Sequence, residues 1–174
     1  MHFQQQRTER RVTVPELPTL LIDTREQTPL QFEHLPSVSA TLQTADYSVK
    51  GLEERLGIER KTWPDINQSV TTGRERFMRE MHRFNGYQYK YLLIIGSQME
   101  LCKLIQQGRF KLNVVHSSLL SIRAKYGVHI IRANTPKQAA NMVETLAYCA
   151  WRDALKPAGV SLPFPDWISK ELIQ

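Results

Sequence analysis

Short runs of apolar residues, bounded by polar ones, predict several strands in the first third of the chain. An apolar run begins at Leu17 and leads through LPTLLID to Asp23. Three more stretches of strand length follow, at residues 37–44, 46–49 and 55–60. Lys50 and Gly51 would form the hairpin turn between the last two stretches. This region is therefore predicted to form an antiparallel meander.

Two helices are predicted directly after these strands. The stretch WPDINQSV places Pro64 and Asp65 in a first helical turn, where proline fits and the helix dipole favours a carboxylate. In GRERFMREMHRFNG, apolar residues recur with helical spacing at Phe77, Met81 and Phe84. Both stretches have their polar residues on the remaining faces, as expected of helices packed on a sheet.

From residue 89 onward, predicted strands and helices alternate. The apolar run 89–96 is typical of a central strand, and residues 128–133 predict another. MELCKLIQQG and SSLLSIRAKYG predict short helices, and Gly127 would end the second. The last helix would start at Thr135 as its N-cap, with Gln138 completing a capping box. This order of elements predicts an α/β fold with a mixed central sheet flanked by helices.

The chain of 174 residues is long enough for one domain with a sizeable core. Residues 1–15 are polar and basic, and we expect them to form a flexible arm. Residues 16–156 would form the globular domain. Residues 157–174 contain several prolines and would form an extended tail that packs on this domain or on a partner.

The balance of charged residues favours a polyanionic partner. Lys and Arg number 23 against 17 Asp and Glu, which gives a net charge of +6. Nucleic acid is the first candidate partner and an anionic membrane surface the second. No apolar run reaches the length of a membrane span, and the histidines lack the spacing of zinc ligands. Cys102 and Cys149 lie in apolar helical patterns, which predicts buried free thiols and an intracellular location.

Acidic residues occur at three predicted strand ends: Asp23 ends the first strand, and Asp46 and Glu59 open and close the hairpin. Each alone could be a turn former, a cap or a surface charge. If the strand ends converge, however, the repulsion between the carboxylates would be relieved by a divalent cation. Mg²⁺ accepts one or two carboxylates, keeps several waters and binds phosphate oxygens.

Lys61 stands two residues after Glu59, so the two side chains share one face of the strand. The pair could be an ordinary surface salt bridge. Beside a carboxylate cluster, however, Lys61 could hold the attacking water or neutralise charge on phosphorus. The set fits metal-dependent hydrolysis of phosphodiesters. By the same alternation Ile58 and Arg60 share the opposite face, so the Arg60 side chain would point away from the metal, while its carbonyl could bind it.

These residues resemble a known family. ADYSVKGLEERLGIERKTWPD is similar to G-D-(x)n-E-R-K-x-x-x-D, the signature of the XPF/Mus-type structure-specific nucleases, a branch of the PD-(D/E)xK superfamily with a restriction-endonuclease-like fold. LLIDTRE resembles the family's V-D-x-R-E, and TTGRERFMREM resembles its N-G-R helix start. The resemblance covers roughly residues 17–155.

The resemblance implies a Mg²⁺- or Mn²⁺-dependent endonuclease that acts on branched or flapped DNA. Asp46 and Glu59 would be metal ligands, Asp23 a further acidic residue of the catalytic metal site and Lys61 the catalytic lysine. Other residues would support the site or face DNA: Arg25, Glu26, Arg60, Asp65 and Arg74. Among the arginines of the second helix, Arg74 is the one expected to reach the site or a phosphate.

The chain departs from the family pattern in two respects. Ala45 replaces the usual glycine before Asp46, which an extended backbone would tolerate. No helix-hairpin-helix domain follows residue 155 and no helicase domain precedes residue 1 in this chain. A partner protein could supply DNA-binding modules, and a homodimer is expected because related nuclease domains pair.

Two alternatives stay open. The chain could be a catalytically silent DNA-binding or scaffold subunit of a nuclease complex, although silent members tend to lose the acidic residues and lysine that are present here. It could also be a PD-(D/E)xK enzyme with another task, such as sequence-specific restriction. The E-R-K-x-x-x-D spacing disfavours that task.

Overall fold

The structure is a computed structural model that describes residues 17–171, so the predicted basic arm at residues 1–15 lies outside it. The strands are β1 (Leu20–Asp23), β2 (Ser37–Ala40), β3 (Tyr47–Val49), β4 (Leu56–Thr62), β5 (Tyr89–Ile95) and β6 (His129–Ala133). The α-helices are α1 (Trp63–Val70), α2 (Arg74–Arg83), α3 (Gln98–Gln106), α4 (Leu112–Tyr126), α5 (Pro136–Leu155) and α6 (Asp166–Glu171). Two 3₁₀ turns, Phe84–Gly86 and Lys156–Ala158, follow α2 and α5.

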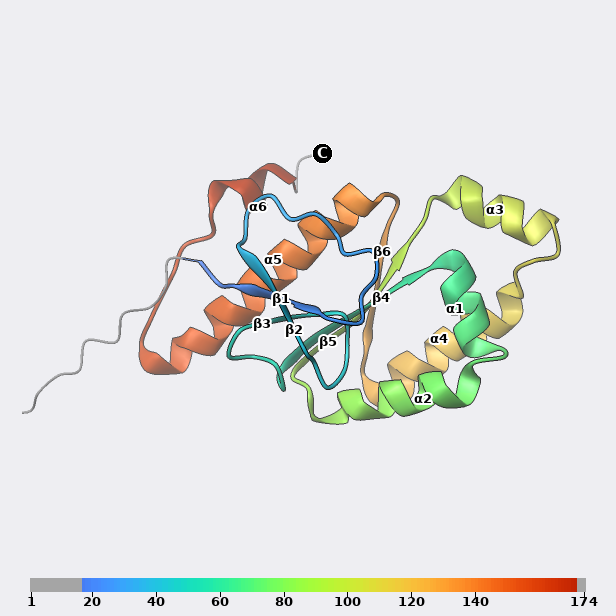
Figure 1. Ribbon diagram of the computed structural model, residues 1–174, viewed down its shortest axis with the longest axis horizontal. Coiled ribbons are helices and arrows are strands. Elements are labelled where there is room, and N and C mark those ends of the chain that lie inside the picture. Colours follow the sequence, from blue (N-terminus) through green and yellow to red (C-terminus); the bar gives the residue numbers. More distant parts are fainter. Residues whose placement is uncertain (1–16, 172–174) are drawn as a thin grey trace, which may run out of the picture.

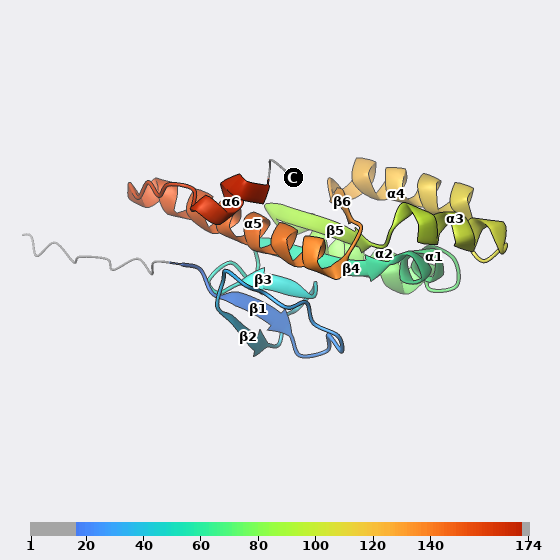
Figure 2. The ribbon, with the colours of Figure 1, turned by 90° about the horizontal axis from the view of Figure 1, so that it is seen from above.

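The strands form one six-stranded mixed sheet in the order β2-β1-β3-β4-β5-β6. Neighbours β1, β3 and β4 are antiparallel, whereas β4, β5 and β6 are parallel. Figures 1 and 2 show α5 and α6 at one end of the molecule and α1 to α4 gathered at the other. The predicted α/β fold with a mixed sheet flanked by helices is confirmed.

The predicted antiparallel meander is wrong for the second strand. β2 pairs with β1 in parallel, at the outer edge of the sheet, and it ends at Ala40, four residues before the predicted end. The reason is the connection of residues 24–36, which is long enough to carry the chain back to the start of β1. A tight hairpin would have reversed the chain instead.

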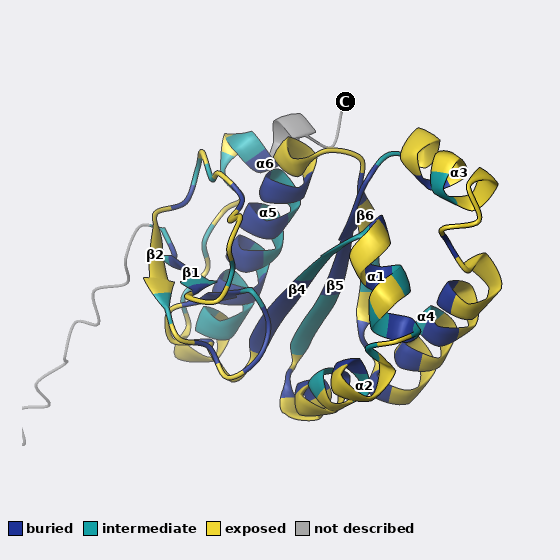
Figure 3. Ribbon diagram, turned by 45° about the vertical axis from the view of Figure 1, so that its right-hand side comes forward, coloured by how far each residue is buried: buried dark blue, intermediate teal, exposed yellow. Residues whose placement is uncertain are grey.

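The apolar alternation of β5 divides the core between the two faces of the sheet. Leu93 and Ile95 belong to the cluster that packs under α5, while Leu92 and Ile94 belong to the cluster under α1, α2 and α4. Figure 3 shows β4 and β5, each buried along part of its length and intermediate along the rest, between the two groups of helices. Each buried Leu or Ile contributes about 1.5–3 kcal/mol relative to an exposed one. The two cores therefore fix β4, whose last residues carry the predicted chemistry.

A buried glutamate anchors the connection of residues 24–36. Glu144 of α5 is 0% exposed, and its Oε1 accepts hydrogen bonds from the backbone N–H of His34 at 2.6 Å and of Leu35 at 2.8 Å. The backbone N–H of Leu30 donates to the hydroxyl of Tyr47 on β3. These contacts hold the segment that begins with Asp23 against the body of the domain.

The tail packs on this domain. Residues 160–165, before α6, have no regular secondary structure, and the hydroxyl of Tyr148 on α5 donates to the carbonyl of Pro163 at 2.7 Å. The guanidinium of Arg152 lies 4.1 Å from the centre of the Phe164 ring, and Ile168 is buried in the core under α5.

Several local predictions need correction. Cys102 is exposed and Cys149 is half-buried, so the prediction of buried thiols is wrong. The Gln138 side chain accepts from the N–H of Asn134 and not from that of Thr135, so no capping box forms there. The start of α4, at Leu112, precedes the predicted helix by several residues. Within residues 17–171, no helix is both long and apolar enough to cross a membrane.

Candidate active site

The three predicted acidic positions do converge, although Glu59 lies in the middle of β4 and not at its end as predicted. The backbone N–H of Asp23 donates to the carbonyl of Asp46 at 2.8 Å, and the N–H of Asp46 donates to the carbonyl of Ile58 at 3.1 Å. Asp23 ends β1, Asp46 directly precedes β3 and Glu59 lies within β4, and all three line one cavity of about 190 Å³ together with Lys61. The sheet brings together the four residues expected to be catalytic.

Glu59 is a deeply buried carboxylate in this cavity. Its residue is 3% exposed, and its Oε1 lies 2.5 Å from Nζ of Lys61. Burial and the nearby charge of Asp46 raise the pKa of Glu59 to about 8, because they outweigh the attraction of Lys61. Burial alone would lower the pKa of Lys61, but Glu59 raises it above its usual value. Lys61 is therefore a cation at neutral pH.

Asp46 is the second acidic group in the cavity whose charged form the protein stabilises only in part. Its Oδ2 accepts the backbone N–H of Arg60 at 2.7 Å, which favours the charged form. Burial nevertheless raises the pKa of Asp46 to about 6. Asp46 and Glu59 thus share a partly desolvated cavity in which their like charges repel.

Asp23 is held in a different way. Its Oδ1 accepts from the backbone N–H of Arg25 at 2.8 Å and from Nε of Arg25 at 2.6 Å, and its Oδ2 accepts from the N–H of Leu42. Burial would raise its pKa, yet these hydrogen bonds hold the pKa of Asp23 below its usual value. The Arg25 side chain is 65% exposed, so the pair lies at the mouth of the cavity.

The donor set fits a hard divalent cation with two protein carboxylates. Within the part of the chain that the structure describes, no three His, Cys, Asp or Glu side chains are grouped so that they could hold a metal ion. Mg²⁺ does not require three, because water and phosphate oxygens complete its octahedron. Asp46 and Glu59 are suitable ligands, whereas Asp23 already accepts three hydrogen bonds from Arg25 and one from Leu42. The structure therefore does not support Asp23 as a third ligand.

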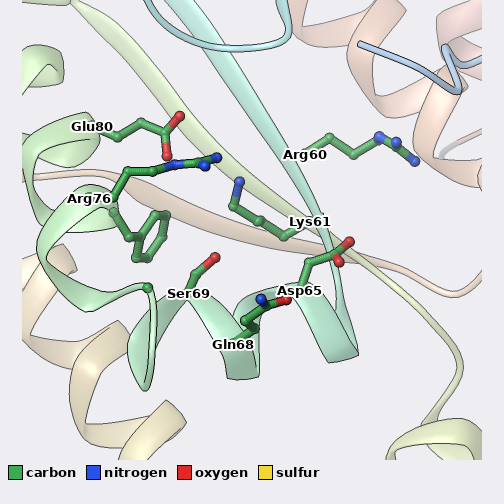
Figure 4. Close-up of a pocket in the computed structure, with 9 residues that line it drawn as sticks. Arg60, Lys61, Asp65, Gln68, Ser69, Arg76 and Glu80 are labelled. Carbon is green, nitrogen blue, oxygen red and sulfur yellow. The ribbon is translucent and has the colours of Figure 1, made fainter. Parts of the chain in front are cut away.

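Arg60 and Glu26 lie behind the strand. Nη2 of Arg60 is 2.9 Å from Oε1 of Glu26 and donates to the hydroxyl of Thr28 at 3.0 Å. Figure 4 shows the Lys61 side chain pointing into a cavity and the Arg60 side chain pointing away from it. The alternation predicted for β4 therefore places Arg60 away from the metal. The ion pair, with side chains 18% and 7% exposed, joins β4 to the segment that follows Asp23.

Comparison with known proteins agrees with this geometry. The family model described as "ERCC4 domain" matches residues 22–146, which run from the second half of β1 into α5 and include the acidic site. The chain belongs to the ERCC4 domain family. This confirms the resemblance to XPF/Mus-type nuclease domains that the motifs indicated. No curated protein sequence is significantly similar to the chain.

Two solved structures share the fold of this ERCC4 domain. XPF from Aeropyrum pernix in complex with DNA is 19% identical, with a TM-score of 0.61 over 78% of this chain. A second structure of XPF from Aeropyrum pernix is also 19% identical, with a TM-score of 0.64 over 85% of this chain. The ERCC4 domain spans 66% of the length of each of these chains. The restriction-endonuclease-like fold is thereby confirmed.

Two other predicted site residues have structural contacts in this ERCC4 domain. Asp65 lines the cavity of Figure 4, but its Oδ2 accepts from both the N–H and the hydroxyl of Thr62, which completes a capping box at the start of α1. Arg74 turns toward α4, where its Nη1 donates to the hydroxyl of Ser118 at 3.0 Å. The structure does not place Arg74 in the cavity.

At the end of α2, Arg83 lines the acidic cavity, and within the helix Arg76 and Glu80 line it, one turn apart. Both flank the buried Phe77, whose ring centre lies 5.7 Å from Nζ of Lys61. The spacing of the apolar residues in α2 could have indicated this choice. The residues on one side of the apolar stripe lie beside β4, whereas Arg74 begins the helix on the other side of the stripe.

The backbone before Asp46 also differs from the expectation. Ala45 has a φ of 72°, in the left-handed region, so the condition under which this substitution would be tolerated without strain, an extended backbone, is not met. A non-glycine residue there costs about 1–2 kcal/mol. The Ala45 methyl is buried, and Gly57 leaves room for it, since a Cβ on Gly57 would lie only 3.3 Å away. Backbone strain is therefore located directly beside a predicted metal ligand.

Proposed function

We propose that this ERCC4 domain is a Mg²⁺- or Mn²⁺-dependent endonuclease that hydrolyses phosphodiester bonds in branched or flapped DNA. The observation that carries the proposal is the cavity in which Asp46 and Glu59 lie next to Lys61. The raised pKa values show that the protein alone stabilises the charged forms of these two carboxylates poorly, and a divalent cation would displace the proton and stabilise the charged forms.

Asp46 and Glu59 would hold the cation, and the carbonyl of Arg60, between Glu59 and Lys61, is a further candidate ligand. When bound, the ion would lower the pKa of a water and stabilise charge on the phosphate. Lys61, kept protonated by Glu59, would donate to a nonbridging phosphate oxygen or orient the attacking water. Hydrolysis then adds water oxygen to phosphorus and breaks one phosphorus–oxygen ester bond.

Asp23 would act through Arg25. Because both Asp23 oxygens bind the guanidinium, the exposed Arg25 side chain is held at the cavity mouth, where a phosphate can contact it. Arg76 and Arg83 of α2 line the same cavity. Together with the net charge of +6, these groups support DNA as the substrate. The Aeropyrum pernix XPF whose structure was solved in complex with DNA agrees with this choice.

The test is cleavage of labelled flap, fork, four-way junction, duplex and single-stranded DNA with Mg²⁺ or Mn²⁺. Glu59→Ala and Lys61→Ala should abolish cleavage, whereas Glu54→Ala and Lys50→Ala, at exposed positions of the same hairpin, serve as matched controls. Cleavage that is unchanged in the first two variants would refute the assigned site. Binding of DNA without cleavage under any condition would favour a silent scaffold subunit.

The homodimer and the partner that supplies helix-hairpin-helix modules are also part of the proposal. Support for pairing comes from β6, which ends the strand order and leaves one edge of the sheet without a strand neighbour among residues 17–171. Light scattering over a range of concentrations measures the mass directly. A monomer at every concentration would refute the homodimer.

A further inference from the structure

A second and larger cavity adjoins the one that holds the acidic residues. Its volume is about 310 Å³, and Lys61, Arg76 and Glu80 line both cavities, so these three side chains form the shared wall. Figure 4 shows Lys61 and Arg76 reaching into the larger cavity from β4 and α2, with Gln68 and Ser69 of α1 opposite them. Lys61, the proposed catalytic lysine, thus faces both cavities, and the proposed hydrolysis takes place only in the one that contains the acidic residues.

The larger cavity contains polar groups without protein partners. Arg76 is exposed and forms no ion pair within residues 17–171, and the side chains of Gln68 and Ser69 make no hydrogen bonds within the same part of the chain. By contrast, Arg60 is paired with Glu26, and Asp65 caps α1. The available hydrogen-bond donors are therefore a guanidinium, an amide and a hydroxyl, a combination suited to phosphate and sugar oxygens.

The charged lining residues and the volume of the larger cavity further limit the kind of ligand that it can bind. Lys61 and Arg76 are the cations whose side chains reach into the cavity, whereas the lining carboxylate of Asp65 is occupied by the cap of α1 and the Arg60 side chain is paired with Glu26. The volume corresponds to about ten water molecules at ~30 Å³ each. A duplex does not fit in such a space, whereas the phosphate and sugar of one nucleotide do.

We propose that the larger cavity binds the phosphate and sugar of the nucleotide next to the cleaved bond. This rests on the proposed nuclease function, since the strand would run from one cavity to the other across Lys61 and Arg76. Arg76 would contact the flanking phosphate, and Gln68 and Ser69 would contact the sugar-phosphate oxygens. Cleavage then requires a charged phosphate on that side of the cut.

Cleavage substrates with one neutral methylphosphonate test the proposal. At the one flanking linkage that occupies the cavity, the neutral group should lower kcat/KM about tenfold to a hundredfold, as expected when a charge-assisted hydrogen bond is lost. In Arg76→Gln the same modification should have almost no further effect. Arg79→Gln, which removes the same charge from the same helix but does not line either cavity, should keep the full effect of the modification.

Equal behaviour of Arg76→Gln and Arg79→Gln, or no penalty at any flanking linkage, would overturn the subsite and leave the nuclease assignment intact. The design also separates local contact from general electrostatic attraction, because both variants lose one positive charge.

A binding measurement is independent of cleavage. Deoxythymidine 3′,5′-bisphosphate carries two phosphates on one sugar, and without metal it should shift the side-chain amide NMR signals of Gln68 but not those of the exposed Gln107 on the C-terminal side of α3. Gln68→Ala combined with Ser69→Ala should weaken its binding about tenfold, and Gln107→Ala should not. An unshifted Gln68 signal would overturn the subsite. A shifted signal in a protein that cleaves nothing would retain the subsite and refute the nuclease.

Discussion

Asp23 at the end of β1 and Glu59 in the middle of β4 are both nearly inaccessible carboxylates of one sheet, yet their environments have opposite effects on them. Asp23 receives backbone and guanidinium hydrogen bonds, and its pKa is lowered. Glu59 is buried near a second carboxylate with one lysine beside it, and its pKa rises to about 8. The first arrangement stabilises the charged carboxylate within the protein, while the second favours the neutral acid until a cation stabilises the charged form. Acidic residues of one motif can therefore serve different purposes.

The largest expected effect is on the rate of DNA cleavage when Glu59 is replaced. Glu59→Gln keeps the shape and an acceptor for Lys61 but removes the negative charge, so single-turnover cleavage should fall about a thousandfold. Glu54→Gln is the control for an exposed glutamate of the same hairpin. A Glu59→Gln rate within about tenfold of the unmodified protein would mean that this carboxylate does not hold the catalytic ion.

Replacing Asp23 should affect the stability of the protein more than replacing Glu59 does. Asp23→Asn weakens charge-assisted hydrogen bonds to Arg25 and to the N–H of Leu42, and it should lower the free energy of unfolding by about 1–3 kcal/mol. Glu59→Gln should change it by less than about 1 kcal/mol without metal, because burial already favours the neutral acid. Urea denaturation of both variants in EDTA measures the difference. If Glu59→Gln is the less stable variant, the comparison fails.

The pH dependence of stability should distinguish the two carboxylates. Glu59 and Asp46 have native pKa values of about 8 and about 6, against ordinary values of 4.5 and 3.8, so the native state binds more protons than the unfolded chain at intermediate pH. Without metal, their contribution to stability is present at low pH and is lost as pH rises from about 4 to 8. Thermal melts in EDTA should show this fall, and Glu59→Gln should flatten it.

Asp23 contributes in the opposite direction. Its lowered native pKa gives stability that is present above its unfolded pKa and is lost as pH falls through the native value. Asp23→Asn should therefore remove part of the loss of stability in acid and leave the slope near neutral pH unchanged. A variant that alters only the neutral slope would contradict the assignment of the hydrogen bonds around Asp23.

The smallest expected effect concerns Ala45, which lies between the two carboxylate sites. Ala45→Gly relieves about 1–2 kcal/mol of left-handed strain but loses the burial of a methyl group, about 0.8 kcal/mol, and gains unfolded-state entropy worth about 0.5–1 kcal/mol. The net change in unfolding free energy should be below about 1 kcal/mol. Ala45→Val, which adds a branched side chain at the same φ, should destabilise the protein more strongly. Equal stability of the two variants would show that φ at this position is not constrained.

Much of the active-site strand could be predicted from local patterns. The period of two along a strand places Glu59 and Lys61 on one face and Ile58 and Arg60 on the other, and the structure has that arrangement. The apolar run of β5 likewise predicts a central strand, since only a strand covered on both faces is apolar at successive positions. These features depend on the geometry of one segment, which neighbouring residues suffice to define.

Other features depend on contacts between segments far apart in the chain. The choice of Arg76 over Arg74 follows from the rotation of α2 against β4 and α4, and the parallel pairing of β2 follows from the path of residues 24–36 over Glu144. The different environments of Asp23 and Glu59 likewise arise only after folding, because burial and long-range hydrogen bonds set the free energy of a charge. A motif names the residues that carry chemistry, whereas the packed tertiary structure determines their protonation and their partners.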